Sequence, residues 1–332
     1  MANGNKRKPR IGILGTGFGQ THAKIFSSFS DVEVIGIVGR DDQKTKKIAH
    51  ALGIQGYADP EKLIKNPTVD AIVVCYPTQL HAKYVLAALN QGKDVFCETP
   101  LAFSLEEANQ MAQAATENGK QLLVALFGRF VSPYKHIQEM VSSHRLGEIR
   151  TVFSNRRTPP IWGADWDENF ILNLMLHDID YVCWLLGKPS AVTSRGLENP
   201  GGGWNHVSIM MEYESAMVTV EGCGIMPPSF PFSTSLRVVG SEAAIDLKWY
   251  WGDDRPVIAM EYYPQDGKPE TLSIVDYDPY EAECRYFIDC IQEKTGSKLL
   301  SIETARDSLS VALAAKESLE QNGERKVVSS LS

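Results

Sequence analysis

The chain has 332 residues, 43% of them hydrophobic and 22% charged, and a formal net charge of −8. This composition excludes a disordered chain and predicts a folded globular protein that is long enough for two hydrophobic cores. The negative charge argues against a general affinity for nucleic acid or for an anionic membrane surface.

The sequence has no run of 18 apolar residues, so no membrane-spanning helix is expected. The apolar run that follows the basic residues 6–10 is too short for a signal peptide, and those basic residues are expected to be solvated. The six cysteines form no C-x-x-C pair and lie mostly in apolar runs. We therefore expect reduced core cysteines, a cytoplasmic protein and no metal site.

From residue 10 to about residue 127, short apolar runs alternate with helical patterns. Ser104 is the expected cap of one helix, with Glu107 at its capping-box position. The alternation predicts a doubly wound parallel sheet. Strands are expected at 10–15, 32–39, 69–77, 93–98 and 121–127, and helices at 21–29, 42–53, 79–92 and 104–119.

After residue 128 the pattern changes. Strands broken by glycine and proline run from 190 to about 275, which predicts an α+β domain built on a mostly antiparallel sheet. We therefore predict one domain over 1–128 and a second over 129–332. In the second, a strand is expected at 149–157 and helices at 133–146, 173–187, 279–293 and 302–321.

The segment GILGTGFGQTHA, residues 12–23, places three glycines between a strand and a helix. Glycine there allows a tight turn and a close approach of phosphate, and the helix N-terminus supplies N–H groups and partial positive charge. Gly15 and Gly17 take the first two places of G-x-G-x-x-G. The third place is Gln20, so Gly19 is expected to supply the flexibility. A plain tight turn is the alternative, but the strand–turn–helix context favours dinucleotide binding.

The end of the second strand bears on the choice of dinucleotide. Gly39 is followed by Arg40, so no carboxylate repels a 2′-phosphate and the guanidinium can pair with it. This favours NADP, with a solvated turn as the alternative reading of Arg40. NAD is not excluded, because Asp41 or Asp42 can still bind a ribose.

Three segments together resemble the glucose–fructose oxidoreductase/inositol dehydrogenase family, often called Gfo/Idh/MocA. They are RIGILGTGFGQTHA (10–23), YPTQLHAKYVLAALNQGKDVFCETPLA (76–102) and HDIDYVCWLLG (177–187), and the resemblance runs from about residue 10 to about residue 325. It implies a Rossmann domain, then a domain with a large open sheet for substrate binding and oligomerisation. It also implies nicotinamide-dependent interconversion of a hydroxyl and a ketone on a sugar, cyclitol or similar polyol, by a homodimer or homotetramer.

The resemblance also implies where the cofactor binds. Pro77, Thr78 and His81 would line its groove, and Glu98 would lie near the nicotinamide ribose. With the loop residues, the expected cofactor-binding set is Gly15, Gly17, Phe18, Gly19, Gly39, Arg40, Pro77, Thr78, His81 and Glu98.

Two catalytic positions depart from the family pattern. Thr99 stands where Glu-Lys-Pro has the lysine that hydrogen-bonds the reacting oxygen, and Asn173 replaces the aspartate of Asp-x-x-x-His. His177 is kept as the expected general base or acid, with a core histidine on an otherwise apolar helix as the alternative. Asn173, four residues before it on one helix face, can hold an imidazole tautomer but supplies no charge. Thr99 can donate only a neutral hydrogen bond.

Other residues can rebuild the site. Asp180 shares the helix face of His177 and can orient it, with an interface charge as the alternative. Arg129 is expected to bind substrate. Trp162 or Trp166 is expected to stack on a sugar face, with a packed surface loop as the alternative. The wider set of candidates is Arg129, Arg156, Arg157, Asp165, Asp180 and a tyrosine.

Three functions follow from this reading. The favoured one is a polyol or sugar oxidoreductase that uses NADP or NAD. The missing lysine and aspartate motivate a second, a non-catalytic NAD(P)-binding sensor or regulator. The third is redox-assisted elimination or hydrolysis with a retained cofactor.

Overall fold

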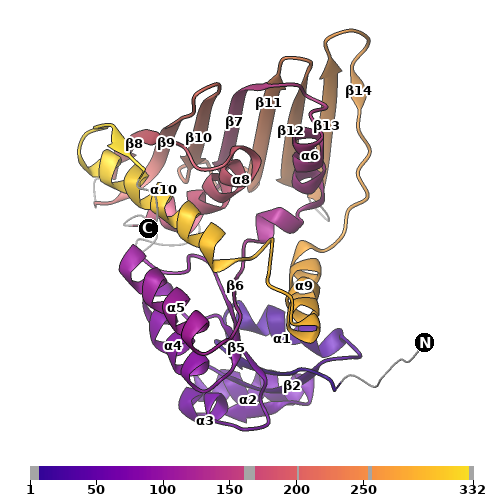
Figure 1. Ribbon diagram of the computed structural model, residues 1–332, viewed down its shortest axis with the longest axis vertical. Helices are drawn as coiled ribbons and strands as arrows, with labels where there is room; N and C mark the ends of the chain where they lie inside the picture. The colour runs from indigo at the N-terminus through magenta and orange to yellow at the C-terminus, as the bar shows by residue number, and fades with distance from the viewer. Residues whose placement is uncertain (1–6, 161–168, 200–201, 253–255, 329–332) are drawn as a thin grey trace. The chain divides into compact units, whose positions relative to one another are not determined.

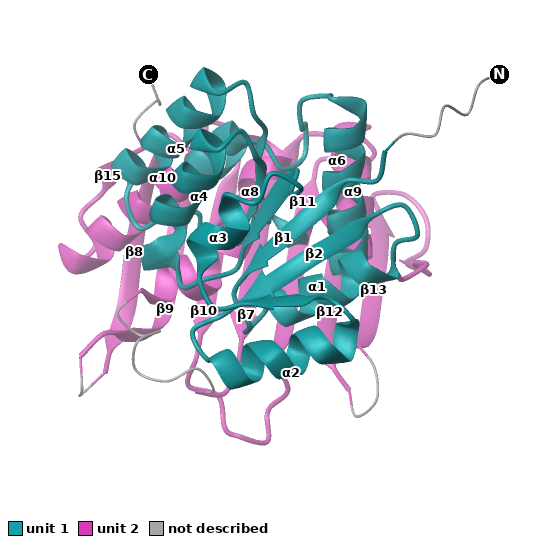
Figure 2. Ribbon diagram, turned by 90° about the horizontal axis from the view of Figure 1, so that it is seen from below, with its two compact units in different colours: residues 1–127, 278–306 teal, residues 128–277, 307–332 magenta. Residues whose placement is uncertain are grey.

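The computed structural model describes residues 7–160, 169–199, 202–252 and 256–328. The chain forms two compact units, shown in teal and magenta in Figure 2. The first contains residues 1–127 and 278–306, and the second contains residues 128–277 and 307–332. Residues 278–306, assigned to the second domain in the sequence analysis, therefore cluster with the first unit.

The first unit is built on a six-stranded sheet in the order β3-β2-β1-β4-β5-β6, in which every pair is parallel. This confirms the predicted doubly wound sheet, and the order is that of a dinucleotide-binding fold. Strand β4 is apolar and buried throughout because helices cover both faces of such a sheet. The strands are β1 (Arg10–Leu14), β2 (Glu33–Val38), β3 (Gln55–Tyr57), β4 (Ala71–Val74), β5 (Asp94–Cys97) and β6 (Leu122–Val124).

Two helices of the first unit have the ends that local chemistry predicts. The Ser104 hydroxyl accepts a hydrogen bond from the Glu107 N–H at 3.2 Å, which confirms the expected cap. Gly53 ends the second helix with a φ of +66°. The helices are α1 (Gly19–Ser28), α2 (Asp42–Leu52), α3 (Pro60–Ile64), η1 (Thr78–Leu80), α4 (His81–Asn90), α5 (Leu105–Glu117), η2 (Phe127–Phe130, which reaches into the second unit) and α9 (Pro279–Glu293).

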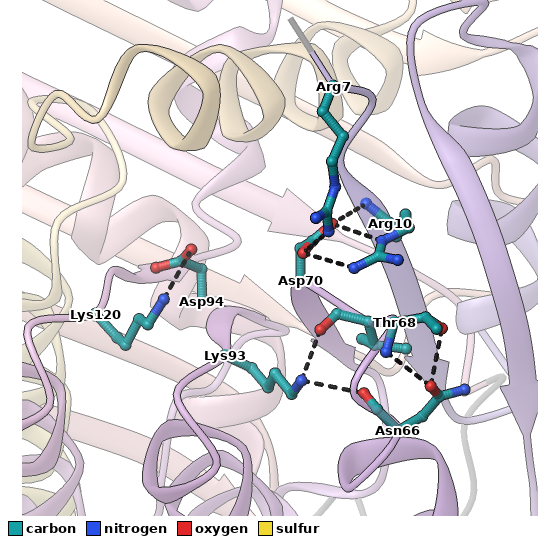
Figure 3. Close-up of polar contacts among 9 residues, drawn as sticks. Arg7, Arg10, Asn66, Thr68, Asp70, Lys93, Asp94 and Lys120 are labelled. Atoms are coloured by element: carbon teal, nitrogen blue, oxygen red, sulfur yellow. Dashed lines mark hydrogen bonds and ion pairs between the residues drawn. The ribbon is translucent and has the colours of Figure 1, made fainter.

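The N-terminal edge of this sheet carries a polar cluster (Figure 3). The Asp70 carboxylate accepts hydrogen bonds from the Arg10 backbone N–H at 3.0 Å, from Arg10 Nε at 3.1 Å and from Arg7 Nη2 at 2.6 Å. Nearby, Lys93 Nζ donates to the Val69 carbonyl at 2.7 Å. Arg7 and Arg10 were expected to be solvated; instead they bind to the residue that precedes β4.

The second unit is built on a nine-stranded sheet in the order β14-β13-β12-β11-β7-β10-β9-β8-β15. Its described pairs are antiparallel except β7 with β10, which confirms the predicted sheet type. The strands are β7 (Ile149–Arg157), β8 (Ala191–Glu198), β9 (Trp204–Glu212), β10 (Met217–Cys223), β11 (Ser233–Gly240), β12 (Ala243–Trp251), β13 (Pro256–Pro264), β14 (Glu270–Thr271) and β15 (Lys326–Val327).

Helices cover one face of the large sheet, as Figure 1 shows. They are α6 (Ser132–Ser142), a π-helical turn labelled η3 (Ile171–Met175), α8 (Leu176–Leu186) and α10 (Ile302–Glu320), whose first residues belong to the first unit. On the other face, the exposed fractions of Phe153, Met210 and Met217 are 38%, 51% and 61%. Among the described residues, no helix is both long and apolar enough to cross a bilayer.

Candidate functional site

The glycine loop after β1 makes a tight turn that leaves part of its backbone unobstructed. Gly15 has a φ of +118°, and a Cβ there would lie 2.5 Å from the Cys75 carbonyl oxygen. A Cβ at Gly17 would meet no atom within 4 Å. Gly15 therefore makes the tight turn, while the backbone at Gly17 remains open to a ligand.

Gly19 takes the place of the third glycine of the motif. It is the first residue of α1, and a Cβ on it would lie 3.2 Å from Ile13 and 3.3 Å from Cys75. This residue therefore sets the close packing of the helix on the sheet, which explains why Gln20 is tolerated at the usual third position. Phe18, at the N-cap, is 40% exposed and has no side-chain oxygen that would occupy the first N–H groups of α1.

The end of β2 presents a cation. Gly39 packs closely against Thr16: a Cβ added to Gly39 would lie 2.3 Å from Thr16 Oγ1. Arg40 follows and is exposed. Asp41 caps α2, accepting hydrogen bonds from the N–H groups of Gln43 at 2.8 Å and Lys44 at 3.0 Å. One oxygen of the Asp41 carboxylate is thus used inside the protein.

The segment after β4 contains three of the expected cofactor residues. Pro77 is exposed and Thr78 half-buried, whereas His81 is only 1% exposed. Its ring nitrogens face the Pro100 carbonyl at 2.9 Å and the Tyr76 carbonyl at 2.7 Å. Burial lowers the pKa of His81. The imidazole therefore lies between the segments that follow β4 and β5 and, when neutral, donates a hydrogen bond to one of these carbonyls.

Glu98 follows β5 at the same carboxyl edge of the sheet and is half-buried. Its Oε1 is hydrogen-bonded to His22 Nε2, and its Oε2 accepts from the Thr99 N–H at 3.3 Å. Ligand atoms of His22, Cys75 and Glu98 all lie within 4.8 Å of one another. No functional role was expected for His22 or Cys75, because no local spacing along the sequence connects α1 with the residues that follow β4 and β5.

In the second unit, His177 lies at the start of α8 and is half-buried. Burial, together with the positive charge of Arg156, lowers the pKa of His177 to about 3. Its neighbour Asp178 accepts hydrogen bonds from Arg156 Nε at 2.6 Å and Ser154 Oγ at 3.0 Å. His177 is therefore neutral near pH 7.

Asp180 and Arg129 are brought together by the fold. Arg129 donates to the two Asp180 oxygens from Nε at 3.0 Å and Nη2 at 2.7 Å, and both residues are 3% exposed. Ser308 Oγ donates to Asp180 at 2.6 Å. The Asp180 carboxylate thus joins α8 to Arg129 and to α10.

Two of the remaining predicted site residues, Asn173 and Thr99, can be placed in the structure. Asn173 is half-buried within the π-helical turn that precedes α8, so the regular four-residue spacing assumed between it and His177 does not describe this segment. Thr99 is half-buried after β5. Trp162, Asp165 and Trp166 lie outside the described residues.

Comparison with known proteins gives relatives for both units. The inositol 2-dehydrogenase of Azotobacter vinelandii is 33% identical over 181 residues, 53% of this chain and 54% of that protein. The trans-1,2-dihydrobenzene-1,2-diol dehydrogenase of Xenopus laevis is 26% identical over 307 residues, 88% of this chain and 91% of that protein. The chain spans about half the length of these inositol dehydrogenases.

Solved structures share the fold. The aldose-aldose oxidoreductase from Caulobacter crescentus is 19% identical with a TM-score of 0.83, over 97% of this chain and 100% of that one. Residues 9–126 match a family model described as "Oxidoreductase family, NAD-binding Rossmann fold", and residues 134–246 match the GFO/IDH/MocA C-terminal domain. These two matches span well over half of the chain, which therefore belongs to the Gfo/Idh/MocA oxidoreductase family.

Proposed function

We propose that the protein is an NAD(P)-dependent oxidoreductase that interconverts a hydroxyl and a ketone on a sugar, cyclitol or similar polyol. The observation that carries the proposal is the glycine loop. A turn that only glycine can adopt at Gly15 and an unobstructed backbone at Gly17 lie at the carboxyl edge of a sheet with dinucleotide-binding order. The names of the inositol dehydrogenase relatives support the substrate class.

The residues divide into cofactor and proton-transfer roles. The loop glycines and Phe18 hold the pyrophosphate at the N-terminus of α1, with Pro77 and Thr78 alongside and Glu98 at the nicotinamide ribose. The bound nicotinamide supplies the hydride acceptor or donor. Neutral His177 takes or returns the hydroxyl proton. Thr99 and Asn173 donate neutral hydrogen bonds to the reacting oxygen or to His177.

Arg129 and Asp180 receive positioning roles in this proposal. Each is buried, and their two-point ion pair fixes α8, the helix that carries His177. The ion pair uses the Nε and Nη2 donors of Arg129, and the side chain is only 3% exposed. We therefore assign the pair to holding the base in place.

The test of the reaction is hydride transfer. A panel of polyols and sugars is incubated with NADP or NAD, and reduced cofactor is followed by absorbance. Replacing His177 with glutamine should lower kcat by about 100-fold or more, since general-base catalysis contributes 10²–10⁴-fold. The control His136→Gln changes a histidine of α6 with no proposed role and should stay near wild type. Transfer that survives His177→Gln undiminished contradicts the assignment.

The sensor or regulator is kept as a second candidate because of Thr99 and Asn173. Neither side chain can supply the charge that the family pattern has at its position, and each loss can lower the rate by about 10²-fold. Tight cofactor binding without hydride transfer on any compound in the panel would favour this candidate over the enzyme.

NADP is the proposed cofactor because Arg40 is exposed at the end of β2 and Asp41 already caps α2. Replacing Arg40 with alanine should lower the affinity for NADPH about tenfold or more, as expected for the loss of a charge-assisted contact with phosphate. The affinity for NADH should stay nearly unchanged. Lys44→Ala removes another exposed cation nearby and is the control. Tighter binding of NADH than of NADPH by the wild-type protein would overturn this choice.

We also propose a homodimer or homotetramer that is joined through the uncovered face of the nine-stranded sheet. Phe153, Met210 and Met217 are exposed there, although side chains of this size usually pack against protein. Replacing Met210 with aspartate should reduce the molecular mass measured by light scattering, whereas a wild-type protein that is a monomer contradicts the proposal.

A further inference from the structure

The carboxyl edge of the first sheet contains a buried hydrogen-bonded chain that the proposed reaction does not itself require. His22 is 0% exposed, and its Nε2 contacts Glu98 Oε1. Its Nδ1 lies 3.2 Å from Cys284 Sγ. The three residues come from α1, from the segment after β5 and from α9, and all belong to the first unit.

The chemistry of the partners sets the direction of these bonds. An ionised carboxylate only accepts hydrogen bonds, so Nε2 of His22 carries the proton that faces Glu98. In the neutral imidazole Nδ1 is then an acceptor, and the Cys284 thiol is its donor. Burial raises the pKa of Cys284, which keeps that thiol protonated. The hydrogen bonds therefore lead from the Cys284 thiol to His22 and from His22 to the Glu98 carboxylate.

Cys75 lies close to the same group, and the set offers nitrogen, sulfur and oxygen ligands. His22 Nε2 and Glu98 Oε1 are hydrogen-bonded directly to each other. We read this arrangement as a hydrogen-bonded support for Glu98.

The position of this support gives it a use. The helix that carries His22 begins at Gly19, in the loop proposed to hold the pyrophosphate. Glu98 is proposed to meet the nicotinamide ribose, and its second oxygen is held by the Thr99 N–H. Thr99 brings no positive charge to this segment, so hydrogen bonds must orient the carboxylate.

We propose that His22 is a positioning residue for the cofactor: it holds the Glu98 carboxylate in the orientation that binds the hydroxyls of the nicotinamide ribose. The inference rests on the proposed NAD(P) binding. It assigns to one side chain of α1 a link between the pyrophosphate loop and the ribose-binding carboxylate. Cys284 of α9 completes the link by fixing the imidazole tautomer.

The test uses three ligands of increasing length on the full chain: 2′,5′-ADP, 2′-phospho-ADP-ribose and NADPH. Only the last two contain the second ribose. His22→Leu removes the hydrogen-bond donor to Glu98. It should lower the affinity for 2′-phospho-ADP-ribose and NADPH by about tenfold, the effect expected when a hydrogen bond to a charged group is lost. Binding of 2′,5′-ADP should stay within about twofold of wild type, because Glu98 lies outside its contacts.

Two further variants keep the test decisive if His22→Leu does not fold. His22→Gln retains an N–H donor at a similar reach and should restore most of the lost affinity. Glu98→Gln should reproduce the ligand-selective loss of affinity. His50→Leu, at an exposed histidine of α2, is the matched control.

The outcomes separate the two proposals. Equal weakening of the binding of all three ligands by His22→Leu and Glu98→Gln, or unchanged NADPH affinity in these two variants, overturns the role of His22 while leaving cofactor binding intact. Failure of the wild-type protein to bind any of the three overturns the cofactor proposal, and the role of His22 with it. A ¹⁵N spectrum with the His22 proton on Nδ1 instead of Nε2 also contradicts the inference.

Discussion

The titration of His177 can be followed through the stability of the protein. Burial, and to a lesser degree Arg156, lowers the pKa of His177 to about 3 in the folded chain. In the unfolded chain a histidine has a pKa of about 6.5. Below about pH 6.5 the unfolded state therefore binds a proton that the folded state does not, and stability falls as the pH falls.

The size of the effect follows from that difference. A pH of 5 lies about 1.5 units below the pKa of the histidine in the unfolded chain. Each of these units corresponds to about 1.36 kcal/mol of unfolding free energy. Lowering the pH from 7.5 to 5 should thus remove about 2 kcal/mol of unfolding free energy through His177 alone. Because glutamine does not titrate, the His177→Gln variant should lack this contribution.

The assay compares urea unfolding of the wild type and His177→Gln at pH 7.5 and pH 5. The variant should gain about 2 kcal/mol relative to the wild type at the lower pH. The imidazole resonance that disappears in the variant should show no titration above pH 5 in the wild-type spectrum. Equal pH dependence of both proteins, or an imidazole that titrates near pH 6.5, would refute the argument that His177 is neutral and buried.

Further substitutions test other parts of the structure. Gly15→Ala should abolish NADPH binding in a titration, because its Cβ would lie 2.5 Å from the Cys75 carbonyl oxygen; binding near wild-type strength would contradict the loop geometry. Arg129→Met should cost about 3–5 kcal/mol in urea unfolding, since it leaves the Asp180 carboxylate buried without its ion pair; a loss below 1 kcal/mol would contradict that. Asp70→Asn changes the partly exposed cluster of Figure 3 and should lower the unfolding free energy by only about 0.2–1 kcal/mol. A larger loss would contradict the expectation that a solvent-exposed ion pair contributes little to stability.

Much of the fold follows from local patterns that can be read along the chain. The strand–helix alternation predicts the parallel sheet, and Ser104 with Glu107 predicts a helix start that the structure confirms. The glycine loop is equally local, since Gly15, Gly17 and Gly19 act through the backbone of a single turn. Periodicity and turn chemistry depend on neighbours within a few residues, which the sequence displays directly.

The partners within the candidate site depend on residues that are far apart in the chain. His22 meets Glu98 across 76 positions and Cys284 across 262, and Arg129 meets Asp180 across 51. Residues 278–306 likewise join the first unit after eight of the nine strands of the second sheet, β7 to β14, have intervened. The sequence by itself thus determined the sheet types, the phosphate loop and the candidate base, and only the tertiary structure decided which buried side chains support them. Side-chain pairing between distant segments is set by how the elements pack, and no periodicity or spacing along the chain encodes it.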